Sequence, residues 1–372
     1  MKQKIGIYVH IPFCKQKCLY CDFVSFEGII ERVEKYIEIL KQEILENAKK
    51  VENYIVTTIY IGGGTPSYIK SKFIVDILET IKKNYTIKKD AEITIEVNPR
   101  TVTKEKLEDY KRVGINRLSI GLQSTNNEIL KEIGRIHTYE DFLETYKLVK
   151  KVGFQNINVD LMLALPKQTY KDLQKSLEQV IKLSPKHISL YSLILEKGTK
   201  LEKLVEQESI ILPEEEIERK MYWDTKKVLE DNGYIHYEIS NFAKEGYESK
   251  HNLNCWNQEP YLGFGISAHS YYNKTRYSNV ANLNKYGVQP KIIHEIQSKQ
   301  DEQKEYMMLG LRKISGVSIS DFKNKFIQNP IYLFRKELDK LVKENLLEID
   351  EDRIKLTNRG LDLANLVWEE FV

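Results

Sequence analysis

The sequence predicts an α/β fold: a partial TIM-type barrel of six βα units, followed by a C-terminal winged-helix-like α+β domain. Three observations support this prediction. Strand-like and helix-like segments alternate over the first two thirds of the chain. Polar residues and glycines gather where the predicted strands end. The last eighty residues show the pattern of three helices, a β-hairpin and a final helix.

The predicted strands are short apolar runs bounded by Gly, Pro, Asn or charged residues. They cover residues 5–11, 57–63, 92–97, 117–123, 156–163 and 187–193. Between them, apolar residues at three- and four-residue spacing predict helices over residues 33–50, 72–85, 104–113, 139–152 and 170–183. Six such units in succession predict a parallel sheet with helices outside it.

The remainder of the chain divides into a connecting segment and a tail. A helix follows Pro213, and residues 233–273 are rich in aromatic residues and Gly. Residues 282–300 have weak periodicity, which suggests a linker. The tail predicts helices over 302–313, 318–326 and 331–345, then a hairpin and a last helix from about Asn358. We therefore expect a barrel at residues 1–240, a connecting segment at 241–290 and a winged-helix-like domain at 291–372.

Composition excludes several classes of protein. The 372 residues carry 57 Lys and Arg against 54 Asp and Glu, and a net charge of +3 gives no argument for a nucleic-acid partner. Four cysteines are too few for a disulfide scaffold. No apolar run approaches the ~20 residues that span a bilayer, so we expect no transmembrane segment and a cytoplasmic location.

Three of the four cysteines form a cluster directly after the first predicted strand. Cys14, Cys18 and Cys21 have a C-x3-C-x2-C spacing, which lets a short loop wrap three thiolates around one small inorganic core. A cubane iron–sulfur cluster held by three cysteines leaves one iron with an open position, which a ligand with an amine and a carboxylate can fill. S-adenosylmethionine is such a ligand, and one electron from the cluster then cleaves its C–S bond.

A zinc site is the alternative interpretation of this cluster. His10, His251 or Cys255 would supply the fourth ligand. Zinc sites usually pair their ligands as C-x2-C, so the spacing favours the iron–sulfur cluster.

The cysteine loop opens a series of motifs with a family resemblance. They are YVHIPFCKQKCLYCDF (8–23), IYIGGGTPS (59–67), IEVNP (95–99), NRLSIGLQS (116–124), IGRIHT (133–138), VDLMLALPKQT (159–169), YEISNFAK (237–244), HNLNCW (251–256), GFGISAHSY (263–271) and MMLGLRKISGV (307–317). Together they resemble the radical SAM superfamily. Within it, the chain resembles the oxygen-independent coproporphyrinogen III oxidases and the related heme chaperones of the HemW family.

This resemblance implies a set of cofactor contacts. Cys14, Cys18 and Cys21 match the ligands of a [4Fe–4S] cluster. The positions that match contacts to S-adenosylmethionine are Tyr8, Tyr20, Gly63, Gly64, Thr65, Glu96, Gln123, Arg135, Asp160 and, less directly, Ile194. Glycines let backbone N–H groups approach a carboxylate, and Arg can hold a carboxylate with two hydrogen bonds.

Two absences favour the chaperone branch over the oxidase branch. The oxidases typically have a fourth cysteine two residues after the third, where this chain has Phe23, and they carry a longer N-terminal extension. The HNxxYW element of the heme chaperones is present as HNLNCW, which makes His251 the candidate heme ligand. Cys255 replaces the Tyr of that element, and its thiolate is the alternative ligand to heme iron.

The resemblance implies that heme and an apo-hemoprotein acceptor are the partners. The alternative function is oxidative decarboxylation of coproporphyrinogen III, which would make the protein an enzyme. The sequence leaves open whether the protein is an enzyme.

Basic residues in the tail alternate with acidic ones, which argues against DNA binding. A homodimer and a peripheral membrane contact are both compatible with the sequence and stay open.

Overall fold

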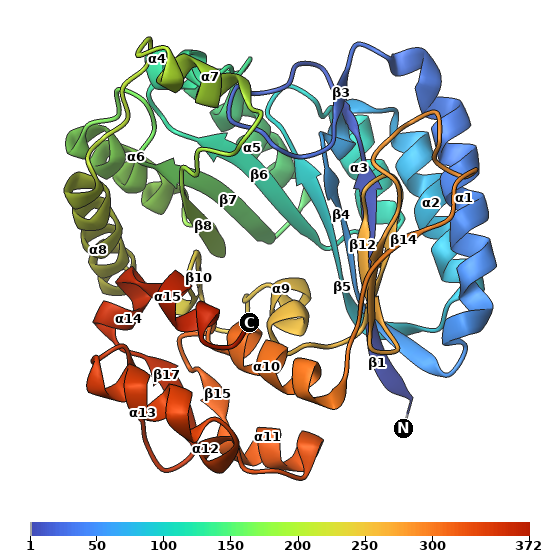
Figure 1. Ribbon diagram of the computed structural model, residues 1–372. Helices are drawn as coiled ribbons and strands as arrows, with labels where there is room; N and C mark the ends of the chain where they lie inside the picture. The colour runs from blue at the N-terminus through green and yellow to red at the C-terminus, as the bar shows by residue number, and fades with distance from the viewer. Residues whose placement is uncertain (1) are drawn as a thin grey trace.

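The computed structural model describes residues 2–372. Six parallel strands form the centre of its main sheet, in the order in which they occur in the chain. They are β1 (Gln3–Ile11), β4 (Tyr54–Gly63), β5 (Ile87–Val97), β6 (Arg117–Gln123), β7 (Asn156–Leu163) and β8 (His187–Ser192). The six-unit prediction is therefore confirmed, and the strands curve into the partial barrel that Figure 1 shows.

Helices connect these strands and pack on the outside of the sheet (Figure 1). They are α1 (Val33–Ala48), α2 (Ser71–Asn84), α3 (Lys104–Arg112), α4 (Asn127–Glu132), α5 (Tyr139–Val152) and α6 (Tyr170–Leu183). Thr138 and Thr169 begin α5 and α6 with capping boxes, in which side chain and backbone satisfy each other's free groups. Apolar side chains of these helices and of the strands form one large core.

Shorter elements surround the barrel. The cysteine loop contains β2 (Phe13–Cys14), which pairs with β3 (Phe26–Glu27). Short 3-10 helices lie at Ile30–Arg32, Lys49–Val51 and Pro66–Tyr68. After β8, the chain forms α7 (Lys200–Glu206) and α8 (Glu215–Asp231).

The main sheet continues beyond the six predicted strands on both sides. β10 (Asn241–Ala243) pairs with β8 and β9 (Ile235–Glu238), both antiparallel, while β11 (Tyr261–Phe264) lies parallel to β1. β12 (His269–Tyr272), β13 (Thr275–Ser278) and β14 (Ile292–Ile296) follow in antiparallel order. Residues 241–290, expected to connect two domains, thus add strands to the barrel sheet, and β14 lies within the expected linker; the domain boundaries themselves stay a prediction.

The tail folds around its own apolar core, as predicted. Its elements are α10 (Lys299–Gly310), β15 (Val317–Ser318), α11 (Ile319–Phe326), α12 (Pro330–Leu333), α13 (Arg335–Lys343), β16 (Leu347–Ile349), β17 (Arg353–Leu356), α14 (Asn358–Asp362) and α15 (Ala364–Glu369). The last three strands form a small antiparallel sheet, which is the wing of a winged-helix-like unit.

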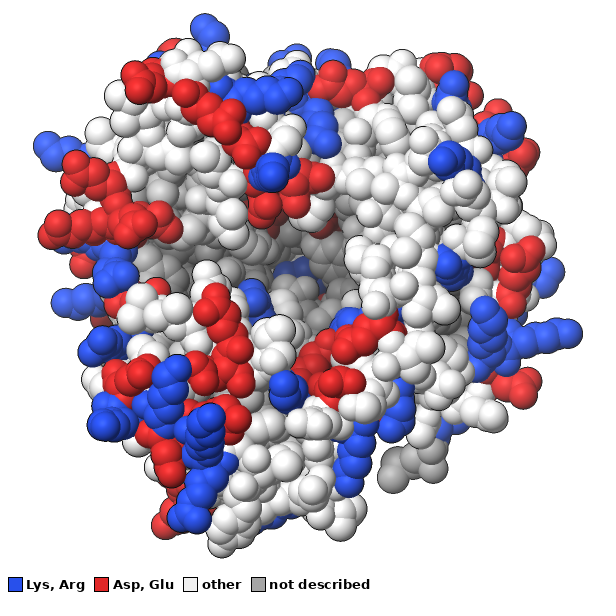
Figure 2. Space-filling view, viewed as in Figure 1, with Lys and Arg blue, Asp and Glu red and all other residues white. Residues whose placement is uncertain are grey.

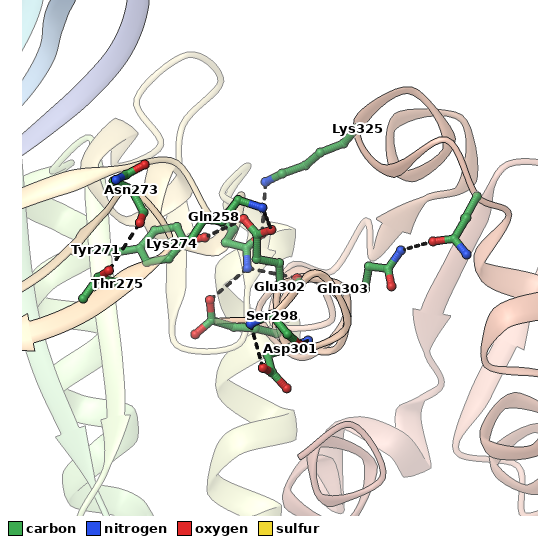
Figure 3. Close-up of polar contacts among 12 residues, drawn as sticks. Gln258, Tyr271, Asn273, Lys274, Thr275, Ser298, Asp301, Glu302, Gln303 and Lys325 are labelled. Carbon is green, nitrogen blue, oxygen red and sulfur yellow. Dashed lines mark hydrogen bonds and ion pairs between the residues drawn. The ribbon is translucent and has the colours of Figure 1, made fainter. Parts of the chain in front are cut away.

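Polar contacts around α10 join the tail to the barrel strands (Figure 3). The Gln258 amide donates to the Glu302 carbonyl over 3.0 Å and accepts from Lys325 Nζ over 3.0 Å. Lys274, in the turn between β12 and β13, forms a 2.7 Å ion pair with Glu302. Gln258 therefore lies between α10 and α11 and connects both helices to the segment after α9 (Lys250–Trp256).

An arginine between two tryptophans makes a second connection. The guanidinium of Arg312 lies 4.4 Å from the ring centre of Trp256 on α9 and 4.6 Å from that of Trp368 on α15. Such stacking is favourable because the aromatic faces carry negative charge density. None of the helices within residues 2–372 has the length and apolar character needed to cross a membrane.

Candidate functional site

A cavity of about 400 Å³ opens at the carboxyl ends of the parallel strands. Parallel barrels collect side chains from successive strands at this end, so residues distant in sequence meet there. Twelve of the predicted residues line the cavity: Cys14, Cys18, Tyr20, Cys21, Gly63, Gly64, Thr65, Glu96, Gln123, Arg135, Asp160 and Ile194. Figure 2 shows the molecule hollowed at its centre, with acidic side chains at the rim.

The cysteine loop closes one side of this cavity. Thr65 Oγ1 donates to Cys14 Sγ over 3.5 Å, and Arg135 Nη1 donates to Cys18 Sγ over 3.5 Å. Behind the loop, His10 Nε2 lies 2.8 Å from the Val24 carbonyl oxygen, so His10 connects β1 with the end of the cysteine loop. Burial raises the pKa of Cys21 to about 11 and also raises that of Cys14, so binding of a metal centre by these two thiols requires the release of their protons.

The three thiols line one cavity without converging on one point. Within residues 2–372, no group of three or more His, Cys, Asp or Glu side chains is gathered closely enough for a single metal ion. Thiolates that bind separate irons of a cluster do not need to be so close. The donor set of three thiols beside an arginine and a glycine turn therefore fits a cluster with one iron left open to a further ligand.

The glycine turn after β4 brings the backbone close to the cysteines. Gly63 has φ +112°, a conformation that side chains rarely tolerate. A Cβ on Gly64 would lie 2.9 Å from Cys14 Sγ and 3.1 Å from the Ile11 carbonyl oxygen. Gly64 therefore leaves space for the cysteine loop to approach the end of β4.

Two carboxyl groups lie inside the barrel. Glu96 accepts hydrogen bonds from the Tyr60 hydroxyl, at 2.9 Å, and from the Gly63 N–H, at 3.2 Å. Asp160 accepts from Asn158 Nδ2 over 2.6 Å. Burial raises the pKa of both, that of Glu96 to about 7, and the charge of Asp160 adds to the effect on Glu96. These acceptors can bind the amine or hydroxyl groups of a ligand.

Arg135 is held in the cavity wall next to the cysteine loop. Its Nη2 donates to Asn98 Oδ1 over 2.8 Å and to the Gly121 carbonyl over 2.6 Å. Negative groups around it, with Cys18 first among them, raise the pKa of the Arg135 guanidinium despite its burial. The guanidinium is thus fixed beside Cys18, where it can bind a carboxylate.

The sequence prediction missed several residues that line the cavity: Tyr60, Asn98, Ser119 and Tyr191. Three of them lie two positions from another residue of the same strand: Tyr60 from Gly62, Ser119 from Gly121 and Tyr191 from Ser189. Period-two alternation along each strand could have placed them on the inner face.

Two predicted residues lie next to the cavity without lining it. The ring of Tyr8 stacks on Tyr60, with ring centres 6.3 Å apart, and its hydroxyl lies 3.0 Å from His10 Nδ1. His251 lies on α9, buried against β4. Tyr60 contacts both of these residues and so connects them with the cavity.

His251 is oriented by three contacts. Its Nδ1 lies 3.0 Å from Thr58 Oγ1, and its backbone N–H donates to Glu92 over 3.1 Å. Its ring stacks on Tyr60 with ring centres 5.2 Å apart. Burial and the nearby positive charge of Arg117 lower the pKa of His251 to about 4, which keeps the imidazole neutral at neutral pH. No described residue forms a hydrogen bond with Nε2, so this nitrogen can bind a metal ion when Nδ1 carries the proton.

Cys255 lies one turn after His251 on α9. Burial raises the pKa of its thiol to about 11, although the charge of Arg276 acts in the opposite direction. A thiol with this pKa is protonated at neutral pH and must release its proton to bind a metal ion, as Cys21 must. The imidazole of His251 is already neutral, so of the two candidate heme ligands it is the one that binds iron without losing a proton.

Comparisons with known proteins agree with this architecture. Residues 8–180 match the model of the radical SAM superfamily, and residues 297–363 match the HemN C-terminal domain. The chain is 37% identical to proteins named heme chaperone HemW from Lactococcus lactis and Bacillus subtilis, over 98% of its length and 96% and 98% of theirs.

A solved structure shows the same fold over the whole chain. Coproporphyrinogen III oxidase (HemN) from Escherichia coli, a radical SAM enzyme, superimposes with a TM-score of 0.86 at 24% identity, covering 100% of this chain and 90% of that one. This likeness concerns the fold, whereas the sequence identity to the HemW proteins extends over almost the full length. The chain belongs to the HemW family of the radical SAM superfamily.

Proposed function

We propose that the protein is a heme chaperone that binds heme through His251 and transfers it to apo-hemoproteins. The observation that carries this proposal is the state of His251: a buried, neutral imidazole, oriented through Nδ1 by Thr58, whose Nε2 is not engaged by any described residue. Neutral imidazole held in this way is a common ligand of heme iron.

The same proposal assigns resident cofactors to the cavity. Cys14, Cys18 and Cys21 would hold a [4Fe–4S] cluster, and S-adenosylmethionine would bind beside it. When bound, this pair supplies one-electron cleavage of a C–S bond. Glu96 and Asp160 would bind amine and ribose hydroxyl groups, Arg135 would bind the carboxylate, and Gly64 would leave space for the cysteine loop beside the ligand.

Phe23 supports the chaperone over the decarboxylating oxidase. It lines the cavity at the position where the resemblance implies a fourth cysteine in the oxidases, and its side chain is exposed. A phenyl ring supplies neither a thiol nor a proton there.

An anaerobic assay on reconstituted protein separates the two functions. We expect heme-loaded protein to transfer heme to an apo-hemoprotein, measured as recovery of the acceptor's Soret band with apomyoglobin as the acceptor. The Cys255→Ala variant is the matched control and should transfer heme as the wild type does. Conversion of coproporphyrinogen III to protoporphyrinogen IX, without heme transfer, would contradict the proposal and support the oxidase.

A further inference from the structure

Arg117 is a buried cation to which neither the fold nor the candidate cofactor site assigns a partner. It opens β6, and only 2% of its surface is exposed. Within residues 2–372 it forms no ion pair or side-chain hydrogen bond, and its Nε is buried without an acceptor. A buried guanidinium is costly unless its N–H groups are satisfied, so the position calls for an anion.

The backbone register places this side chain inside the barrel. Ser119, Gly121 and Gln123 line the cavity at the following alternate positions of β6, so Arg117 points to the same inner face, one step deeper.

Arg117 belongs to a row of residues that crosses five neighbouring strands in register. The row consists of Tyr8, Tyr60, Thr94, Arg117 and Asn156. Three neighbours in it carry buried polar atoms without a hydrogen-bond partner: Thr94 Oγ1, Arg117 Nε and Asn156 Oδ1. The Thr94 hydroxyl and the Arg117 guanidinium are hydrogen-bond donors on neighbouring strands. Together they can bind an oxygen anion.

The two carboxyl groups inside the barrel, Glu96 and Asp160, do not accept hydrogen bonds from Arg117 or Thr94. Glu96 is satisfied by Tyr60 and the Gly63 N–H, and Asp160 by Asn158 and Ser119. Arg117 lowers the pKa of both carboxyl groups at a distance but forms no hydrogen bond with either. Its planar fork is therefore free for a carboxylate, which it can bind with two hydrogen bonds.

One member of this row of residues, Tyr60, contacts the candidate heme ligand His251. Tyr60, two strands from Arg117, stacks on the imidazole of His251, and Arg117 itself acts electrostatically on that imidazole. We propose that Arg117, with Thr94 beside it, is the carboxylate anchor for a propionate of the heme whose iron binds His251. This inference rests on the proposed function and specifies how the porphyrin is oriented: iron toward α9 and one propionate toward β6.

The test compares hemin with its dimethyl ester, in which the propionates have no charge. Both ligands are titrated into full-length protein and followed by the Soret band. The proteins are the wild type, Arg117→Met, Arg117→Lys and, as matched control, Arg112→Met on the exposed face of α3. Circular dichroism and thermal unfolding of each variant show whether it is folded.

We expect the wild type and Arg112→Met to bind hemin at least about tenfold more tightly than the diester. Arg117→Met should lose this preference by weaker binding of hemin alone, and Arg117→Lys should keep part of it. The ester comparison gives a result on the wild type even if Arg117→Met does not fold.

Two outcomes overturn the proposal. Equal affinity of the wild type for hemin and diester shows that no charged propionate is recognised. An unchanged preference in folded Arg117→Met shows that another group recognises it and that Arg117 is only a distant counter-ion of Glu96 and Asp160. In both cases hemin still binds, so the proposed function stands; absence of hemin binding to the wild type removes both.

Discussion

The ring of Tyr60 stacks on the imidazole of His251, with ring centres 5.2 Å apart and an angle of 30° between the planes. The Tyr60 hydroxyl at the same time donates to Glu96 in the cavity over 2.9 Å. One side chain on β4 thus contacts both the candidate cofactor cavity and the candidate heme ligand. We infer that the two sites are adjacent parts of one barrel interior, and that a movement of Tyr60 would alter the contacts of both His251 and Glu96.

Glu96 should make stability depend on pH. Its pKa rises from an ordinary value of 4.5 to about 7 in the folded protein. As the pH rises through this range the unfolded chain releases the proton first, so the free energy of unfolding falls. Glu96→Gln should lack this fall and gain about 1–3 kcal/mol relative to wild type between pH 4.5 and pH 8. Chemical denaturation of cofactor-free protein at several pH values measures the difference.

The exposed Glu108→Gln on α3 is the control for this experiment. It should keep the wild-type pH dependence. If Glu96→Gln and wild type change in parallel from pH 4.5 to pH 8, the carboxyl of Glu96 is not perturbed as the structure indicates.

Gly64→Ala should impair cluster binding. The added Cβ would lie 2.9 Å from Cys14 Sγ and close to backbone atoms of the same loop, which must then move. Displacing a ligand in this way should weaken cluster binding by about tenfold or more. Iron and sulfide content after anaerobic reconstitution measures it.

Gly246→Ala is the matched control for the glycine turn, because a Cβ there meets no atom within 4 Å. Its positive φ of 78° leads us to expect a loss of about 1 kcal/mol in stability with unchanged iron content. Full iron loading of Gly64→Ala would mean that the cysteine loop adapts and that the close approach has no role.

Arg312 should stabilise the attachment of the tail to the barrel. It lies between Trp256 and Trp368, and loss of both contacts in Arg312→Ala should lower the free energy of unfolding by about 1–3 kcal/mol. Arg312→Lys should lose less, since it keeps the charge. Urea denaturation followed by tryptophan fluorescence reports the change.

Arg335→Ala, which removes an exposed ion pair with Asp339, should change stability by less than about 0.5 kcal/mol. A loss of the same size in this control and in Arg312→Ala would mean that stacking between the tryptophans contributes nothing specific.

The parts of the fold that follow local rules could be predicted from the sequence. Strand β7 and helices α5 and α6 have the predicted bounds, because apolar periodicity and end caps determine them locally. The gathering of the cysteines, Gly63 and Glu96 at one end followed from the rule that parallel strands end on the same side.

The parts that depend on distant contacts could not be predicted. Strands β9–β14 have three to five residues each, and their place in the sheet is set by pairing with β8 and β1 rather than by their own sequence. His251 meets Thr58 across 193 residues of chain, so no local pattern shows which ring nitrogen is held. Arg117 gave a weak signal, a charge opening an apolar strand, whose meaning emerges only from the register with Thr94 and Asn156.

The central claim is that His251 binds heme iron, and titration of hemin into wild type, His251→Ala and His269→Ala tests it most directly. His269 is an exposed histidine on β12 and controls for surface binding. We predict that wild type and His269→Ala give the same Soret spectrum of histidine-ligated heme. His251→Ala should bind hemin at least about tenfold more weakly and lose that spectrum. Hemin binding by folded His251→Ala with wild-type affinity and spectrum would contradict the account.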